Sequence, residues 1–528
     1  MEINVIELKK KVWLQSHIIL YGCGEYAKKT YESLKKIDVI PDYCVISGEV
    51  CGETFFESKI PVYNVEKKVN SIRENKSLVI ISVSELYQDE IKKTLTDLKI
   101  NNYIDITEYD RNSMDYIKRY ETMNKEDCLQ EIATWYMDNT EKYYESEVNT
   151  ISKIKKAAMA KISKENEVVI ALAHLTPRTV KVIDGLKNGG YKINIIASSE
   201  ASLSPMWVQD IEKLGFKIIR CNSFSEWMYK LIFSKAKIIH LFTHRHHAYY
   251  DKILIKFKDL FPKIVYDEYD IVNRIYKDIS KDVLDNEKYC LENADAICNR
   301  GFDIEYLKKE HNYRINSEVI QFHDYCSNQQ YICRNINKDN TLSLCYVGGI
   351  YSRHQNESFM ECQLEFIKLC EKNKVHYHIY PAGWSEEYFK EYIECDINNE
   401  YFHFHKPLPF SELIKEITKY DYGVSLMKEE MKKTAFNVVI TFDYAACNKF
   451  FDYLDAGLPI IASAPLKTVD FYEEKGVLLR WNIEDFDFKV LRERRKELSN
   501  KVLKVREELR IDNNINQLIE FYEKVLQK

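Results

Sequence analysis

The segment NKFFDYLDAGLPIIAS, residues 448–463, places a lysine, a carboxylate and a glycine–proline break within one short stretch. Its apolar spacing predicts a helix that ends at the break and a buried strand that follows. On that helix, the Asp452 carboxylate can accept hydrogen bonds from hydroxyl groups, and the Lys449 ammonium can neutralise phosphate. The N-terminus of the helix can also face an anion. The alternative interpretation is an ordinary junction between a helix and a strand.

A glycine pair precedes this segment in the loop CYVGGIYSRH, residues 345–354. Gly348 and Gly349 follow a buried strand, so the backbone there can approach a phosphate closely. Arg353 follows as a cation that can bind a diphosphate. Gly383 after IYPAG and His405 after YFHFH follow two further predicted strands in this part of the chain. By themselves they can be a turn glycine and a histidine whose hydrogen bonds are satisfied within the fold.

A third cluster of polar residues ends the run KIVYDEYD, residues 263–270. Its carboxylates are Asp267, Glu268 and Asp270, and they belong at the carboxyl edge of a sheet, where sites in α/β proteins form. We predict that Asp270 is a catalytic or acceptor-side residue, with a solvated loop end as the alternative.

The run HLFTHRHH, residues 240–247, gathers four histidines. We predict that His244 ends a strand, faces the cleft and takes part in catalysis, and that the other histidines, His240 included, lie at the surface. No carboxylate or cysteine completes a recognised ligand spacing with them, so no metal site is predicted. Arg178 in HLTPRT begins a helix, where it either meets an anionic acceptor or points into solvent.

The elements that position these residues are predicted from short apolar runs separated by helix-length intervals. These runs, which we interpret as strands, occur in three series along the chain. The predicted strands lie at 17–22, 42–47 and 77–84; at 167–174, 191–198, 216–223, 236–244, 263–270 and 294–300; and at 342–349, 375–383, 401–407, 420–427 and 458–464. The expected fold class is α/β, with three Rossmann-like doubly wound parallel-sheet domains. The predicted divisions are a small domain at 1–108, a helical connector at 109–165, and two larger domains at 166–335 and 336–528, the last ending in charged helices.

The segment at 448–463 resembles the retaining GT-B glycosyltransferases, whose matching stretch reads roughly Glu-Tyr-Leu-Ala-Ala-Gly-Lys-Pro-Val-Val-Ala-Ser. Asp452 occupies the position of the acidic residue that binds the donor ribose in that family. Many members carry another glutamate eight residues earlier, where this chain has Tyr444. The resemblance implies that the last two domains form a GT-B pair, that a UDP-sugar or GDP-sugar donor lies between them, and that no metal or other cofactor is required. It also implies that Gly383 and His405 line the nucleotide pocket of the donor.

The turn YGCGEYA, residues 21–27, is a Gly-x-Gly-x-x-Ala pattern between a predicted strand and helix. Gly22, Gly24 and Ala27 are therefore candidate nucleotide-binding residues. The second strand ends in Ser47 without the acidic residue that usually binds the ribose of NAD. The segment 17–108 resembles the nucleotide-sugar-binding domain of PglD-type sugar acetyltransferases, although the hexapeptide repeats of that family's catalytic helix are missing. An empty crevice with a purely structural role is the alternative.

The composition narrows the class of protein further. The 528 residues include 45% hydrophobic and 30% charged residues, which indicates a folded globular chain. The formal net charge of −6 argues against a nucleic-acid partner. No signal peptide or membrane-spanning run is recognisable, so we expect a cytoplasmic protein. Such a protein can also bind peripherally to the inner face of the membrane. The 14 scattered cysteines are interpreted as reduced core thiols.

These observations together predict a glycosyltransferase of bacterial surface-glycan synthesis. It would transfer a sugar from a nucleotide diphosphate to a glycan, lipid-linked or protein acceptor, with retention at the anomeric carbon implied by the resemblance. Two alternatives stay open: a nucleotide-sugar-binding scaffold without activity, and an NAD-linked sugar-modifying enzyme that acts through the N-terminal domain.

Overall fold

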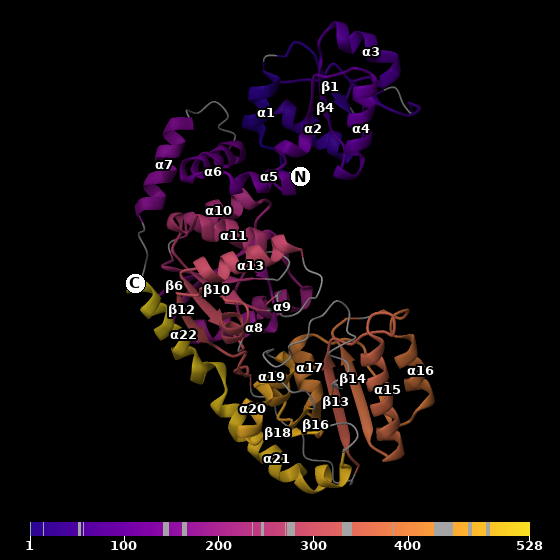
Figure 1. The fold of residues 1–528 in the computed structure, drawn as a ribbon, viewed down its shortest axis with the longest axis vertical. Helices are drawn as coiled ribbons and strands as arrows, with labels where there is room; N and C mark the ends of the chain where they lie inside the picture. Colours follow the sequence, from indigo (N-terminus) through magenta and orange to yellow (C-terminus); the bar gives the residue numbers. More distant parts are fainter. Residues whose placement is uncertain are drawn as a thin grey trace. The chain divides into compact units, whose positions relative to one another are not determined.

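The computed structural model describes residues 2–13, 15–50, 54–55, 58–140, 147–160, 166–234, 236–243, 248–269, 271, 280–301, 303–329, 341–383, 385–426, 447–462, 467–481 and 486–528. The chain forms two compact units (Figure 1). The first comprises Met1–Ile162, Ile196–Ser199 and Arg220–Ser234, and the second comprises Ser163–Ile195, Glu200–Ile219 and Lys235–Lys528.

The first sheet has the strand order β3-β2-β1-β4-β5 in the described residues, and each pair of neighbouring strands is parallel. The strands are β1 (Ile18–Tyr21), β2 (Tyr43–Ile46), β3 (Val62–Asn64), β4 (Leu78–Ile81) and β5 (Tyr103–Asp105). The helices are α1 (Val5–Val12), α2 (Glu25–Lys35), α3 (Val65–Glu74) and α4 (Glu85–Asp97). Successive residues of β1 belong to two different apolar clusters, one on each face of the sheet, as in a doubly wound domain.

The described elements between the first sheet and residue 160 are all helices. The elements are η1 (Ile106–Tyr109), α5 (Met114–Lys118), η2 (Arg119–Glu121), α6 (Lys125–Asn139) and α7 (Glu147–Ala160). Helix α6 packs against α10 (Phe224–Ile232), which belongs to the same unit. The Trp135 and Tyr136 rings lie 4.9 and 5.5 Å from the Tyr229 ring, so this aromatic pair packs between helices.

The second sheet has the order β12-β11-β10-β9-β6-β7-β8 among the described strands. The strands are β6 (Glu167–His174), β7 (Lys192–Ser202), β8 (Ile218–Arg220), β9 (Ile238–Phe242), β10 (Lys263–Glu268), β11 (Ala296–Asn299) and β12 (Glu318–Gln321). The helices are α8 (Pro177–Asn188), α9 (Pro205–Lys213), α11 (Ala248–Lys256), η3 (Lys258–Leu260), α13 (Lys281–Asn293) and α14 (Asp303–Glu310).

The third sheet has the order β15-β14-β13-β16-β17-β18 in the described part of the chain, again with parallel pairs. The strands are β13 (Ser343–Gly348), β14 (His376–Pro381), β15 (Phe402–Phe404), β16 (Tyr422–Ser425), β17 (Ile460–Ala462) and β18 (Leu478–Arg480). The helices are α15 (Glu357–Lys372), α16 (Lys390–Asn398), α17 (Phe410–Ile417), α19 (Asn448–Asp455), α20 (Lys467–Glu474), α21 (Phe488–Glu508) and α22 (Ile511–Leu526).

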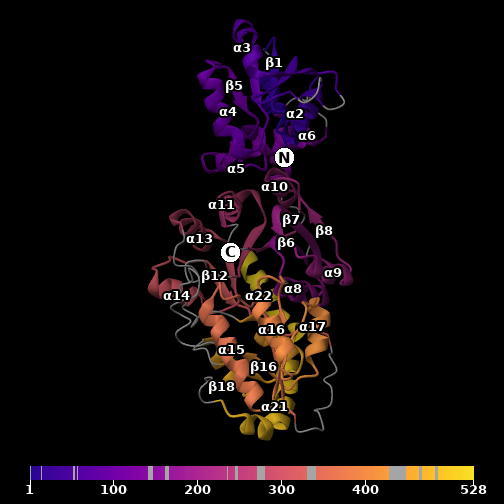
Figure 2. The ribbon, with the colours of Figure 1, turned by 90° about the vertical axis from the view of Figure 1, so that its right-hand side faces the viewer.

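The last helix, α22, leaves the third sheet and packs along α8 beside the second one (Figures 1 and 2). The approach is close at Gly185, where a Cβ atom would lie 2.7 Å from the Ile511 side chain. A larger residue at this position would separate the two helices. The chain therefore ties the second and third sheets together through its own C-terminus.

All 14 predicted strands are present, so the predicted fold class is confirmed: three parallel, Rossmann-like sheets, the last two forming a GT-B pair. Four strands were not predicted: β3, β5, β12 and β18. Each of the four is a short strand at the edge of its sheet, with fewer fully buried residues than the central strands.

Candidate functional site

Helix α19 is fixed against the carboxyl end of the third sheet by Tyr453. The Tyr453 ring lies directly on Gly423 of β16, where a Cβ atom would come within 2.2 Å of the ring. Its hydroxyl donates to the Val424 carbonyl at 2.8 Å and accepts from the Val347 amide at 3.2 Å. One buried side chain thus connects the helix to both β13 and β16, which sets where the helix N-terminus lies.

The glycines predicted at this edge come together. Strand β13 ends at Gly348, whose φ of +112° lies in the region that favours glycine. The Ala382 amide donates to the Gly348 carbonyl at 3.0 Å, which brings the end of β14 and the following Gly383 alongside. Gly349 and Gly383 are exposed, and a Cβ atom on either would meet nothing within 4 Å. The backbone at this edge is open to a ligand.

Lys449 lies in the first turn of α19 and reaches this glycine turn. Its ammonium lies 3.9 Å from the centroid of the Tyr346 ring and donates to the Tyr346 hydroxyl at 2.8 Å. That hydroxyl donates in turn to the Gly349 carbonyl at 2.7 Å. Burial acts to lower the pKa of Lys449, but Tyr346 and Cys447 outweigh it and the net shift is upward. The side chain is therefore a half-buried cation at neutral pH.

Asp452 lies one turn further along the same face of α19, where its side chain is 13% exposed. Its Oδ1 is 3.6 Å from the ammonium of Lys181 in α8, and Asp455 Oδ2 is 3.4 Å from the same nitrogen. Burial raises the pKa of Asp452 to about 7, with Asp455 adding to the rise and Lys181 opposing it. Two carboxylates thus share one cation, and Asp452 is poised to change charge near neutral pH.

Asn448, the first residue of α19, contacts two residues that the sequence did not single out. Its side chain accepts a hydrogen bond from Arg300, after β11, and donates one to the Tyr269 hydroxyl, after β10. The Arg300 guanidinium also lies 3.9 Å over the Tyr269 ring. These contacts place a second cation at the N-terminus of α19. No sequence motif marked Arg300, because its position depends on how the two sheets meet.

Arg353 is held by carboxylates on the flanking helices. Its guanidinium lies 2.9 Å from Glu391, 3.4 Å from Glu357 and 3.5 Å from Glu361, with 40% of the side chain exposed. Three acidic neighbours compete with any phosphate for this cation. The structure therefore places Lys449, rather than Arg353, at the glycine turn.

His405 is a partner of other aromatic and imidazole groups. Its ring stacks on Tyr380 at 4.2 Å, and its Nε2 lies 3.0 Å from His378 Nδ1. Burial, together with the nearby charge of Lys419, lowers the pKa of His405 to about 4. It is therefore a neutral imidazole whose hydrogen bond is met within the fold.

The carboxylates of β10 form a buried network. Asp267 accepts from Arg178 at 3.1 and 3.0 Å and from His240 at 2.9 Å. Burial acts to raise the pKa of Asp267, but Arg178 and His240 lower it to about 2. Arg178 also donates to the Asp324 carboxylate at 3.2 Å and is 2% exposed, which excludes the predicted solvent-facing position.

The predicted surface position of His240 is wrong. The side chain is fully buried because it lies in the middle of β9, the central strand between β10 and β6, and it contacts the Tyr522 hydroxyl of α22. Asp270 and His244, the two predicted catalytic residues, lie outside the described residues, as does Tyr444.

The N-terminal glycine turn lies between β1 and α2. Gly22 has a φ of +119°, and a Cβ atom there would lie 2.8 Å from the Ser82 carbonyl oxygen at the end of β4. Gly24 precedes α2 and is open, while Ala27 is fully buried under the helix. Gly22 is therefore required by packing between strands, and Gly24 leaves room for a ligand.

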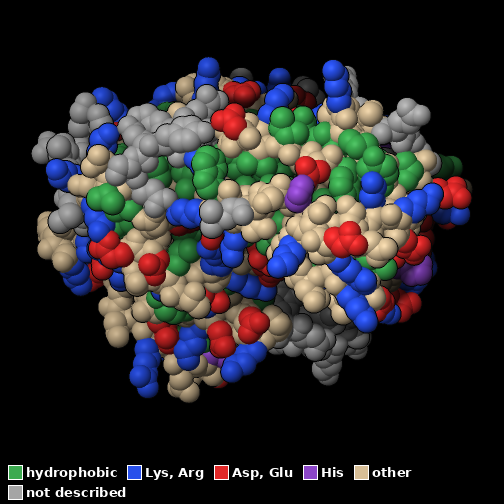
Figure 3. All heavy atoms as spheres, turned by 90° about the horizontal axis from the view of Figure 1, so that it is seen from above, with side chains coloured by type: hydrophobic (Ala, Val, Ile, Leu, Met, Phe, Trp, Pro, Cys, Tyr) green, Lys and Arg blue, Asp and Glu red, His purple; other side chains and the backbone are tan. Residues whose placement is uncertain are grey.

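Side chains of several kinds share the face seen in Figure 3, where hydrophobic groups form a band bordered by charged ones. Exposed large apolar residues of the first unit include Trp13, Ile40, Leu86 and Tyr87.

Within the described residues, no helix is both long enough and apolar enough to cross a membrane. The described cysteines are free thiols, and nine of these twelve are buried, as the sequence predicted.

Comparison with solved structures supports the fold. Neither a protein-family model nor a curated protein matches the sequence. A glycosyltransferase from Rickettsia africae aligns over 69% of this chain and 100% of its own, with a TM-score of 0.50 and 11% identity. A UDP-GlcNAc 2-epimerase from Neisseria meningitidis bound to UDP-GlcNAc aligns over 68% of this chain and 100% of its own (TM-score 0.43, 10% identity). An alpha-glucosyltransferase in complex with UDP and DNA aligns over 69% and 99% (TM-score 0.42, 12% identity). Of these three structures, only the Rickettsia africae glycosyltransferase, with its TM-score of 0.50, serves as support for the fold.

Proposed function

We propose that this protein transfers a sugar from a nucleotide diphosphate donor, and that the donor binds at the carboxyl edge of the third sheet. The observation that carries the proposal is the position of Lys449. Its ammonium stands at an open glycine turn beside a helix N-terminus, with Arg300 at the same helix end. Backbone amides, a helix N-terminus and cations together favour a diphosphate.

The charge on Lys449 is available to a ligand. Among the described residues, no carboxylate lies within 4.0 Å of its ammonium, and its partners are the ring and hydroxyl of Tyr346. A half-buried cation of this kind interacts with an anion more strongly than a surface lysine does, because water screens it less. As the sugar leaves, charge develops on the diphosphate, and a fixed cation there lowers the barrier without a covalent step.

Asp452 is proposed to bind the donor ribose. A carboxylate can accept hydrogen bonds from both ribose hydroxyls, and the ionised form accepts them more strongly. In the absence of ligand, Asp452 is paired with Lys181 and has a pKa of about 7. Donor binding through this group should therefore strengthen as the pH rises through 7 and should release a proton.

The remaining features of the reaction follow from the resemblance of the segment at 448–463. We propose transfer with retention, without a metal, to a glycan, lipid-linked or protein acceptor in bacterial surface-glycan synthesis. Asp270 and His244 are the proposed catalytic residues on the acceptor side. Cytoplasmic nucleotide sugars would be the donors, with UDP or GDP as the nucleotide.

The N-terminal domain is proposed to bind a nucleotide or nucleotide sugar at the turn that holds Gly22, Gly24 and Ala27. The open position at Gly24, at the N-terminus of α2, supports this proposal. Ser47 ends the second strand where NAD-binding domains carry an acidic residue, and its hydroxyl bonds to Tyr21 at 2.5 Å. NAD is therefore the less favoured ligand.

The test combines binding and turnover on the full chain. Thermal shifts with UDP, GDP, CDP and NAD identify the nucleotide, because a bound ligand raises the melting temperature. A panel of sugar nucleotides then reports hydrolysis or transfer. Lys449→Ala should weaken nucleotide binding by roughly tenfold or more, whereas Lys390→Ala, at a side chain that is 76% exposed in the same domain, should leave it unchanged.

The outcomes separate the alternatives. Nucleotide binding that depends on Lys449, with turnover of one donor, supports the transferase. Binding without turnover of any donor supports the scaffold, for which Tyr444 in place of a glutamate is the favouring observation. Equal binding by the Lys449→Ala and Lys390→Ala variants would exclude the proposed donor site.

A further inference from the structure

Four histidines form a ladder on two neighbouring strands of the third sheet. His376 and His378 alternate with the buried Tyr377 on β14, so both lie on the same face of the strand. His403 on β15 is the direct register partner of His378. His405 directly follows the last residue of β15 and bonds to His378. The ladder lies on the partly exposed face, opposite the apolar cluster that contains Tyr377.

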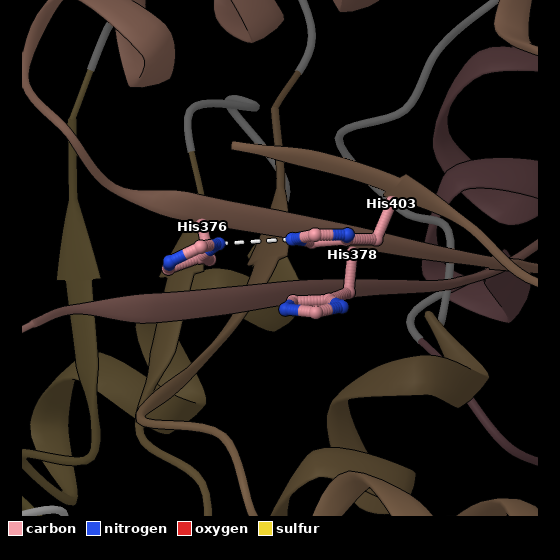
Figure 4. Close-up of side chains that lie close together, drawn as sticks. All are labelled: His376, His378 and His403. Atoms are coloured by element: carbon pink, nitrogen blue, oxygen red, sulfur yellow. Dashed lines mark hydrogen bonds between the residues drawn. The ribbon is translucent and has the colours of Figure 1, made fainter. Parts of the chain in front are cut away.

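Three of these side chains converge (Figure 4). One ring nitrogen from each of His376, His378 and His403 can be chosen so that all three atoms lie within 4.8 Å of one another. The closest pair, His376 Nδ1 and His403 Nε2, is separated by 2.9 Å, and the rings of His378 and His403 stack at 4.3 Å. Figure 4 shows the His376 and His403 rings meeting edge to edge, with the His378 ring beside them.

We propose that His376, His378 and His403 bind a Zn²⁺ ion. A tetrahedral zinc site with Zn–N distances of about 2.0–2.1 Å separates its ligand nitrogens by about 3.3 Å, so the closest pair needs to open only slightly. The third nitrogen lies within 4.8 Å of the other two, and the His378 ring, which stacks on the His403 ring, would have to turn for its nitrogen to bind the same ion. Two histidines spaced i, i+2 on one strand and a third, paired with one of them on the next strand, place all three imidazoles on one face of the sheet.

The three imidazole ligands favour zinc over metal ions that prefer oxygen ligands. Three imidazoles suit zinc and its transition-metal neighbours, whereas Mg²⁺ and Ca²⁺ prefer oxygen ligands. His405 lies close enough to orient His378 through its hydrogen bond, as outer partners of metal-bound imidazoles do. Lys419, whose charge acts on His403, is paired with Glu416, which offsets that charge.

A second group of possible ligands shows why this one is preferred. His240, Asp267 and Cys298 also lie within 4.8 Å of one another. The guanidinium of Arg178 occupies that group, since it donates to both Asp267 oxygens and lies 3.4 Å from the Cys298 sulfur. A divalent metal ion could bind this second group only by displacing the buried guanidinium of Arg178. At the histidine ladder, by contrast, the three rings bond to neutral groups.

The zinc ion would act on the fold and not on the donor. His376 is the first residue of β14, and Pro381 is the last. At 3.3 Å per residue the two are roughly 17 Å apart, and the open glycines at the carboxyl edge of the sheet lie beyond Pro381. Strand β15 is short and lies at the edge of the sheet. A metal bridging β14 and β15 would fasten that edge strand, so the inference does not depend on the proposed sugar transfer.

Metal content tests the inference on the purified full chain. After treatment with a chelator and desalting, the protein is incubated with Zn²⁺, desalted again, and analysed for bound zinc by mass spectrometry. We expect about one equivalent in the wild type and a rise in melting temperature on loading. His376→Asn and His403→Asn should each weaken zinc binding by roughly tenfold or more. The matched control is His354→Asn, an exposed histidine of the same domain.

Cobalt gives a readout that does not depend on the variants folding. Co²⁺ in a tetrahedral nitrogen site produces visible absorption bands that octahedral surface-bound Co²⁺ lacks, and Zn²⁺ should abolish them by displacement. Absence of these bands in the wild type, or zinc binding that is equal in the His376→Asn and His354→Asn variants, would overturn the proposal. The histidines would then be a ladder of hydrogen-bonded neutral rings.

Discussion

Replacement of Lys181 tests the balance of charges beside helix α19, where we propose that the donor binds. The Lys181 side chain is 4% exposed, lies 3.6 Å from Asp452 and 3.4 Å from Asp455, and donates to the Tyr325 carbonyl at 2.9 Å. Lys181→Met keeps most of the volume and removes the charge. The two carboxylates then lose the only lysine or arginine within 4.0 Å in the described residues.

The magnitude follows from the two distances. At an effective dielectric constant of about 20, each pair at this separation gains about 4 to 5 kcal/mol, which desolvation of the three groups largely offsets. Removing one partner of a buried ion pair leaves that desolvation uncompensated, so we expect a loss of about 3–5 kcal/mol. For a domain of this size, the loss corresponds to a melting temperature lower by about 10 °C.

The loss should depend on pH with a defined sign. The pKa of Asp452 is raised in the folded state, so the folded state binds more protons than the unfolded state below about pH 7. Protonation of Asp452 removes one of the charges that Lys181 balances. The destabilisation by Lys181→Met should therefore be larger near pH 8 than near pH 5.

Thermal melting of both proteins at the two pH values is the assay. Lys187→Met, at an exposed lysine of the same helix, is the control and should change the melting temperature little. Adding Asp452→Asn and Asp455→Asn to Lys181→Met should restore much of the loss at the higher pH. A loss that is the same at both pH values, or no larger than that of the control, would refute the reasoning.

Three further predictions concern two glycines, Gly22 and Gly423, and the carboxylate of Asp452. Gly22→Ala should lower the melting temperature, because the new Cβ would lie 2.8 Å from a backbone carbonyl at a positive φ, while Gly24→Ala should not. Gly423→Ala should cost roughly 1–3 kcal/mol by thermal melting, because it forces Tyr453 off the strand, and it should weaken nucleotide binding as α19 shifts. Nucleotide affinity in calorimetry should rise between pH 6 and pH 8 in the wild type, since the pKa of Asp452 is about 7, and this dependence should vanish in Asp452→Asn. A pH-independent affinity in the wild type would remove Asp452 from the proposed site.

The sequence predicted central strands well and edge strands poorly. Central strands such as β6 and β9 are buried on both faces and read as continuous apolar runs, EVVIALAH and IIHLF. Edge strands such as β3 and β18 span three residues each and include partly exposed positions, so their runs are too short and too polar to detect. The helical tail was also recognisable, but its return to α8 was not, because helical periodicity does not specify a partner.

For the candidate site, the sequence identified groups that lie together in one segment. Lys449 and Asp452 share a helix face, and Gly348 and Gly349 share a turn, so local spacing is enough to place each pair. Arg353 shows the limit of this reasoning: its distance along the chain from the glycine turn was right for a phosphate ligand, but three glutamates from α15 and α16 surround it.

The sequence by itself determined the three parallel sheets, because hydrophobic periodicity and glycine breaks are local properties that each segment carries. Tertiary structure alone decided which charges meet. Lys181 and Asp452 are 271 positions apart in the chain, yet the Lys181 Nζ and Asp452 Oδ1 atoms lie only 3.6 Å apart. The pKa of Asp452 depends on that meeting and on burial, since both the loss of water and the field of a neighbouring charge exist only after the sheets have packed.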